Sequence, residues 1–77
     1  MELALYYKPS CHYCQKVLKF MESQQIKIPL KNTQTDPRHL EELRTVGGKT
    51  QVPCLFIDGK AMYESDDIIA WLQQNYK

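Results

Sequence analysis

Two kinds of hydrophobic spacing divide the first third of the chain. Residues 3–7 form a short apolar and aromatic run that ends at Lys8, Pro9 and Ser10, which predicts a buried strand stopping at a turn. Beyond the turn, apolar side chains recur every three or four residues between polar ones, at Cys14, Val17, Leu18 and Met21. This second spacing predicts an amphipathic helix.

The middle of the chain predicts another strand and another helix. Over residues 26–30, isoleucine and leucine alternate with lysine and proline. Because Pro29 has no N–H to donate to a neighbouring strand, we expect this strand at an edge of the sheet. The next helix is predicted to begin with Asp36 as N-cap and Pro37 at its first position, and to end at the glycine pair 47–48. Its inner face consists of Leu40, Leu43 and Val46.

The last third predicts a hairpin followed by a helix. Residues 52–57 are too continuously apolar for one side of the strand to be exposed to solvent, which predicts a strand in the interior of the sheet. Asp58 and Gly59 are typical of a two-residue hairpin turn, and residues 60–63 then form the returning strand. Ser65 is the expected N-cap of a final helix, whose inner face is Ile68, Ile69 and Leu72, with Trp71 partly inward. The predicted order is β-α-β-α-β-β-α.

Length and charge narrow the function classes. Seventy-seven residues form one domain, residues 1–77, and 10 Lys plus Arg against 9 Asp plus Glu predict no binding to nucleic acid or to a membrane surface. We expect a monomer. No apolar stretch is as long as a membrane span or a signal peptide, which favours the cytoplasm. Three cysteines, an odd number, argue against a disulfide-stapled secreted scaffold.

The pair Cys11 and Cys14 is the main candidate for chemistry. Cys11 falls at the start of the predicted first helix, where free N–H groups and the helix dipole stabilise a thiolate. Cys14 lies one turn further on and opens the buried face, so we expect it to be shielded. The spacing therefore indicates a dithiol redox site with an attacking and a resolving sulfur.

Three features together resemble a glutaredoxin over essentially the whole chain. These are the Cys-x-x-Cys after the first strand, Val52-Pro53 entering the third strand, and Ser-Asp-Asp at residues 65–67. The resemblance implies a thioredoxin-like α/β fold, with a four-stranded mixed sheet flanked by three helices. It also implies an enzyme that uses glutathione to reduce protein disulfides and glutathione mixed disulfides.

The resemblance also implies a set of glutathione contacts. Lys8 matches the family lysine near the thiolate and the glutathione carboxylate, and Tyr13 matches the aromatic residue between the cysteines. Val52 would pair its backbone with the cysteinyl part of glutathione, and Pro53 would be the cis proline facing the dithiol. The γ-glutamyl end would be held by Ser65 and Asp66. No metal is implied in this reaction.

The chain departs from the glutaredoxin pattern at three places. His12 replaces the usual proline, and a protonated His12 beside Cys11 would make the pair more oxidising. Gln51 stands where threonine is usual. Glu64-Ser65 resembles the pair with which the N-terminal domain of glutathione transferases binds the γ-glutamyl group, although we expect no second, all-helical transferase domain here.

Other readings stay open at this point. The cysteines could hold a [2Fe–2S] cluster between two subunits, with glutathione as an additional ligand. Alternatively, a thioredoxin reductase rather than glutathione could donate the electrons that reduce the dithiol. Cys54 is expected in the core rather than as a third redox thiol. Lys49 is a candidate for the glycine carboxylate of glutathione, whereas His39 and the arginines at 38 and 44 are expected on the surface.

Overall fold

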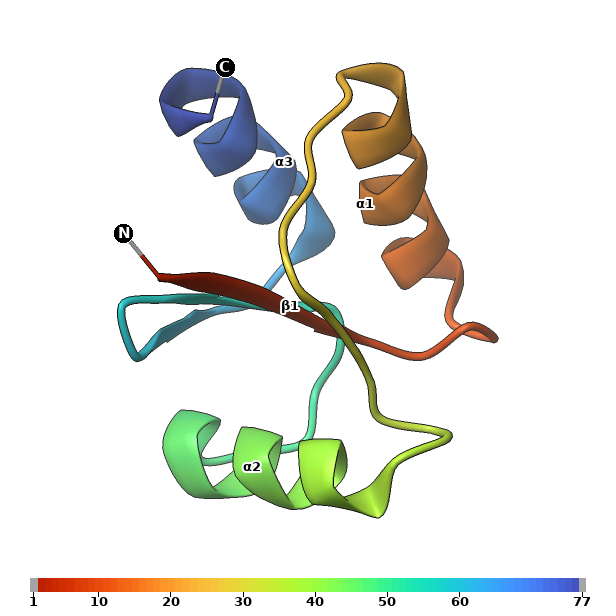
Figure 1. Cartoon of the computed structure of the whole chain (residues 1–77), viewed down its shortest axis with the longest axis vertical. Coiled ribbons are helices and arrows are strands. Elements are labelled where there is room, and N and C mark those ends of the chain that lie inside the picture. Colours follow the sequence, from red (N-terminus) through yellow and green to blue (C-terminus); the bar gives the residue numbers. More distant parts are fainter. Residues whose placement is uncertain (1, 77) are drawn as a thin grey trace.

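The computed structural model describes residues 2–76 as a sheet between two layers of helices (Figure 1). The order is the predicted one, β-α-β-α-β-β-α. The helices are α1 (His12–Ser23), α2 (Pro37–Gly47) and α3 (Ser65–Asn75). The strands are β1 (Leu3–Tyr7), β2 (Leu30–Asn32), β3 (Cys54–Ile57) and β4 (Lys60–Met62).

The sheet is mixed and has the strand order β2-β1-β3-β4. β1 runs parallel to β2 and antiparallel to β3, while β3 and β4 form the antiparallel hairpin. The hairpin turn has positive φ at Asp58 and Gly59, 50° and 85°, as expected for a tight turn of this sequence. The edge position of β2 and the interior position of β3 are both confirmed. The fold is therefore thioredoxin-like, with four strands and three helices.

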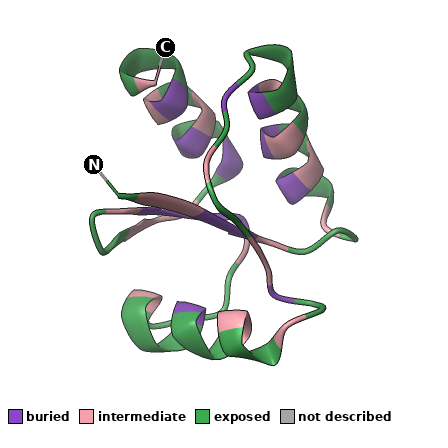
Figure 2. Cartoon of the chain, viewed as in Figure 1, coloured by how far each residue is buried: buried purple, intermediate pink, exposed green. Residues whose placement is uncertain are grey.

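Two hydrophobic clusters hold the layers together. Helices α1 and α3 cover one face of the sheet, where Val17, Ile68 and Leu72 pack against Leu5 and Leu55. Helix α2 covers the other face and contributes one fully buried side chain, Leu43. Leu43 packs with Tyr6, Cys54 and Phe56. Figure 2 shows the buried residues along the helix sides that face the sheet. Cys54 is thus a core residue, as predicted.

The boundaries of three predicted strands were wrong, and the smallest difference is in β4, which ends at Met62 rather than Tyr63. β2 begins at Leu30 rather than Ile26, because Ile26 is buried in the cluster under α1 and α3 and the parallel pairing begins only at Leu5 and Leu30. Pro29 still contributes, since its carbonyl oxygen accepts the N–H of Leu5 at 2.9 Å. β3 begins at Cys54 rather than Val52, because Pro53 has no N–H with which to pair.

Three side-chain expectations were also wrong. The N-cap of α3 is Glu64, with φ 72°, because the Glu64 carbonyl accepts the Ile68 N–H at 3.0 Å; Ser65 is the first helical residue. Val46 is 48% exposed, because it borders a cavity of about 200 Å³ beside Phe56 instead of filling the core. His39 is partly buried rather than exposed.

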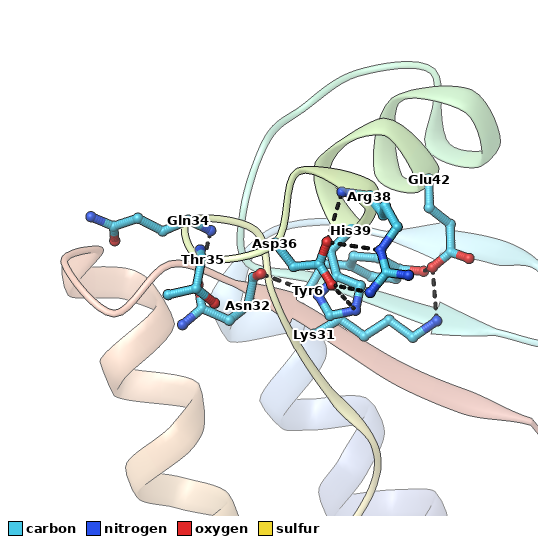
Figure 3. A network of polar contacts seen from close by, with 9 residues as sticks. All are labelled: Tyr6, Lys31, Asn32, Gln34, Thr35, Asp36, Arg38, His39 and Glu42. Atoms are coloured by element: carbon cyan, nitrogen blue, oxygen red, sulfur yellow. Dashed lines mark hydrogen bonds and ion pairs between the residues drawn. The ribbon is translucent and has the colours of Figure 1, made fainter.

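A polar network surrounds His39 at the start of α2 (Figure 3). His39 Nδ1 lies 3.1 Å from the carbonyl oxygen of Asn32, and Asp36 caps the helix by accepting the Arg38 N–H at 2.9 Å. The Arg38 guanidinium also pairs with Asp36 at 3.0 Å. These contacts leave Arg38 on the surface, as predicted, and tie α2 to the end of β2.

Candidate active site

The two cysteines of the dithiol differ in their exposure. Cys11 is the N-cap of α1 and is partly exposed, and its sulfur accepts the N–H of Cys14 at 3.2 Å. Cys14 is fully buried. Burial, and after it the hydrogen bond with Cys11, raises the pKa of the Cys14 thiol to about 12. The predicted asymmetry between a reachable and a shielded sulfur is therefore present.

A groove of about 690 Å³ opens beside Cys11. Three separate segments line it, at Tyr13, residues 51–53 and residues 64–67. Cys11 is not itself a lining residue, but its thiol donates to the carbonyl oxygen of Val52, which is one, at 3.9 Å. The Val52–Pro53 peptide bond is cis, as the family resemblance implied for Pro53. The partly exposed Cys11 sulfur therefore lies next to a residue that lines the groove.

Most of the predicted contact residues meet in the groove. Seven of the eight line it, namely Tyr13, Gln51, Val52, Pro53, Glu64, Ser65 and Asp66. Lys8 is exposed and is not among the lining residues; its carbonyl accepts the Cys11 N–H at 3.1 Å in the turn before α1. Lys49 stacks on the ring of Tyr63 at 4.3 Å and does not line the groove either.

Sequence reasoning missed two residues of this site. Asp67 lines the groove beside Asp66. Its position directly after Ser65 and Asp66, at the start of the last helix, is the sequence feature that could have indicated this. Lys16, on α1, forms an ion pair with the carboxylate of Asp66 on α3. The two positions are 50 residues apart, so no local pattern indicated this pair.

The third cysteine lies apart from Cys11, whereas His12 directly follows Cys11 in the chain. Cys54 is fully buried on the α2 side of the sheet, and burial raises the pKa of its thiol to about 11. His12 is exposed on the first turn of α1, with its ring 5.9 Å from that of Tyr13. Within residues 2–76, no three His, Cys, Asp or Glu side chains are grouped so as to hold a metal ion. No helix in the same range is long and apolar enough to cross a membrane.

Comparison with protein families and known sequences gives two matches. Residues 5–77 match the family described as glutathione S-transferase, N-terminal domain. The chain is also 30% identical over 57 residues to a glutaredoxin-like 8.6 kDa protein from the rubredoxin operon of Clostridium pasteurianum. That alignment covers 74% of this chain and 76% of the relative.

Solved structures share the fold. Glutathione transferase Omega 3C from Trametes versicolor superposes with a TM-score of 0.82 at 26% identity, over 99% of this chain and 34% of the transferase. The thioredoxin-like protein BC3987 gives 0.78 at 22% identity, over 95% and 97% of the two chains. Glutaredoxin C1 from Populus tremula x tremuloides gives 0.70 at 21% identity, over 95% and 75%.

Proposed function

Since the chain belongs to the glutathione S-transferase N-terminal domain family and has a glutaredoxin-like relative, we propose that it is a glutathione-dependent thiol-disulfide oxidoreductase. Its substrates would be protein disulfides and glutathionylated proteins, and it would act as a monomer in the cytoplasm. The observation that carries the proposal is the partly exposed Cys11 sulfur in contact with Val52, a residue that lines the groove.

The first step is nucleophilic attack by the Cys11 thiolate. It attacks the glutathionyl sulfur of a mixed disulfide, forming a Cys11-glutathione disulfide, and the protein thiolate leaves and takes a proton from water. The N–H of Cys14 stabilises negative charge on Cys11, because it already points at that sulfur. A second glutathione thiolate then attacks the adduct, releasing glutathione disulfide and the Cys11 thiolate. No metal or nucleotide takes part.

The groove supports binding of the glutathionyl group. The backbone of Val52, which lies next to the cis bond, is available to pair with the cysteinyl part of the tripeptide. The first N–H groups of α3 and the Ser65 hydroxyl can donate to the γ-glutamyl carboxylate. These contacts would place the glutathionyl sulfur at Cys11.

Cys14 would serve only the protein-disulfide route. After Cys11 attacks a protein disulfide, Cys14 must lose its proton and attack the mixed disulfide to free the substrate. A buried thiol with a pKa of about 12 is almost entirely protonated at neutral pH. The resolving step therefore requires Cys14 to lose its proton, whereas the glutathionyl route needs only Cys11 and free glutathione.

The proposal is tested by removing one thiol at a time. Reduction of a glutathionylated peptide is followed with glutathione and glutathione reductase, comparing Cys11→Ser with Cys54→Ala. We expect Cys11→Ser to abolish turnover. Cys54→Ala, which removes a thiol on the other side of the sheet, should retain it. Full activity in Cys11→Ser would disprove the assignment. Activity with thioredoxin reductase but none with glutathione would point to a different electron donor.

A further inference from the structure

Two walls of the groove come from separate segments, and one side chain outside the lining is linked to both. The first wall is residues 51–53 and the second wall is residues 64–67. Tyr63 is not among the lining residues, but it directly precedes the second wall in the chain. Its hydroxyl donates to the carbonyl oxygen of Gly47, the last residue of α2, at 2.9 Å. Tyr63 therefore joins the segment that leads into the first wall to the start of the second.

The loop between α2 and β3, residues 48–53, depends on side chains for its position. In the part of the chain that the structure describes, no backbone-to-backbone hydrogen bond involves this loop beyond its first residue. Tyr63 contacts both ends instead. Its hydroxyl bonds to Gly47, directly before the loop, and interacts with the thiol of Cys54, directly after it. Within the loop, the Lys49 ammonium lies 4.3 Å from the centre of the Tyr63 ring.

The lack of a side chain at Gly47 makes room for the Tyr63 hydroxyl. A Cβ atom at position 47 would lie 2.4 Å from the Tyr63 oxygen, well inside van der Waals contact. The next nearest atoms would be 3.5 and 3.6 Å away, which is ordinary contact. Unlike Gly48, Gly47 does not have a positive φ, so its backbone alone does not require glycine. The Tyr63 hydroxyl is therefore what excludes a larger residue here.

The second wall begins in a conformation that needs support on both sides. Glu64 has φ 72°, in the left-handed region that residues other than glycine rarely adopt. Ser65, after it, is buried, and Tyr63, before it, is held by Gly47. The two walls also meet directly, because the side-chain amide of Gln51 donates to Glu64 at 3.4 Å. A shift of Tyr63 would therefore move Glu64 and change the distance between the walls.

We propose, on the basis of the function proposed above, that Tyr63 is a positioning residue for the glutathionyl group, which sets the distance between the two walls without touching the ligand. Its hydroxyl holds the loop and thereby the backbone of Val52, to which the cysteinyl part of the tripeptide would bind. Loss of the hydroxyl leaves the Cys11 sulfur and the N–H of Cys14 in place. Since only non-reacting parts of the substrate are affected, the loss acts on KM rather than on kcat.

The test compares two tyrosine-to-phenylalanine variants. Tyr63→Phe removes the hydroxyl at the loop. Tyr6→Phe removes a hydroxyl that donates to the Glu42 carboxylate, also on α2, and Tyr6 does not line the groove. A bond to a carboxylate is at least as strong as one to a carbonyl, so the control variant loses no less stability. With saturating glutathione, we expect Tyr63→Phe to raise KM for a glutathionylated peptide about two- to fivefold at unchanged kcat, and Tyr6→Phe to change neither.

A substitution at Gly47 tests the contact itself. Gly47→Ala alone displaces the Tyr63 hydroxyl, so it should raise KM at least as much as Tyr63→Phe does. In the Tyr63→Phe background the colliding oxygen is gone, so Gly47→Ala should raise KM no further. Equal rises in the two backgrounds would overturn the inference, because the effect of Gly47→Ala would then not pass through the hydroxyl.

Labelling of Cys54 separates this inference from the proposed function, because it needs no substrate. Cys54 is fully buried where the loop meets β3, so iodoacetamide reaches it only when this region opens. We expect labelling of Cys54, followed by peptide mass spectrometry, to be about fivefold faster in Tyr63→Phe, the factor for one hydrogen bond, and unchanged in Tyr6→Phe.

The outcomes distinguish the two proposals. An unchanged KM or unchanged Cys54 labelling in Tyr63→Phe would overturn the inference and leave the proposed function intact. So would equal changes in Tyr6→Phe, which would reduce Tyr63 to a general contribution to stability. If the wild-type protein does not reduce the glutathionylated peptide, the proposed function fails and the role in binding fails with it, while the labelling still decides whether Tyr63 holds the loop.

Discussion

Replacing Cys14 separates the chemistry of the dithiol from its role in packing. The Cys14 side chain is fully buried at the start of the α1 face that packs against the sheet. Serine at this position would bury a hydroxyl, at a cost of about 1–3 kcal/mol when it lacks a full set of partners. Alanine instead leaves a small cavity, at a cost of about 1 kcal/mol. We therefore expect Cys14→Ser to be the less stable variant.

Both variants should remain folded. A domain of 77 residues has a free energy of unfolding on the order of 4–12 kcal/mol. A loss of about 2 kcal/mol, with an m value of about 1 kcal/mol/M, lowers the urea midpoint by about 2 M. Fluorescence of Trp71, which packs against the hydrophobic cluster between the sheet and helices α1 and α3, reports the transition.

The activity of the two variants tests the mechanism directly. Both should still reduce a glutathionylated peptide, because Cys11 and free glutathione are sufficient for that route, and both should lose the intramolecular route for protein disulfides. A folded Cys14→Ala protein that cannot reduce the glutathionylated peptide would refute the proposal that Cys14 is needed only for protein disulfides. Wild-type stability in Cys14→Ser would refute the argument from burial.

Three further measurements test the structure around the site. Native protein treated with iodoacetamide at pH 8 should be alkylated once, at Cys11, because burial raises the pKa of Cys14 to about 12 and of Cys54 to about 11. The number of labels is measured by mass spectrometry, and two or three labels would contradict this prediction. His12→Pro tests the expectation that a protonated His12 makes the dithiol more oxidising: the reduction potential measured against glutathione should fall, and an unchanged potential would remove this role of His12. The same change should raise stability by about 0.4–1 kcal/mol by restricting the first position of α1. The hydrogen bond and ion pair with Arg38 lower the pKa of Asp36 to about 2, below its value in the unfolded chain. Asp36 therefore stabilises the fold above about pH 4, and this stabilisation is lost as the pH falls through about 2. Asp36→Asn should make the urea midpoint less dependent on pH between 5 and 2, and an unaltered dependence would show that another carboxylate is responsible.

Local patterns along the chain were sufficient for the fold and for the position of Cys11 at a helix start. The order of elements, the Asp36 cap, the hairpin at residues 58–59 and the position of Cys11 at a helix start all depend on neighbours within a few residues. The shielding of Cys14 follows from the same helical spacing. Such features are readable because propensity, capping and amphipathic spacing act over one or two turns.

Element boundaries needed the neighbouring segments. Ile26 and Ile28 alternate as in a strand, but their side chains join the cluster under α1 and α3 before pairing with β1 begins. Val46 has the spacing of a buried residue and lies beside a cavity, while His39 is partly covered through contacts at the end of β2. In each case the packing partner comes from another element, so it has no signature in the local sequence.

The sequence by itself determined that Cys11 lies at a helix start and that Cys14, one turn further on, lies on the buried face. It also determined the residue types available for binding. Only the tertiary structure decided that Tyr13, residues 51–53 and residues 64–67 enclose one groove, that Lys8 is not part of its lining, and that Lys16 pairs with Asp66. The physical reason is distance along the chain. A helix start is built by hydrogen bonds within one turn, whereas the charge of the groove depends on which side chains three distant segments bring together and which of them neutralise one another.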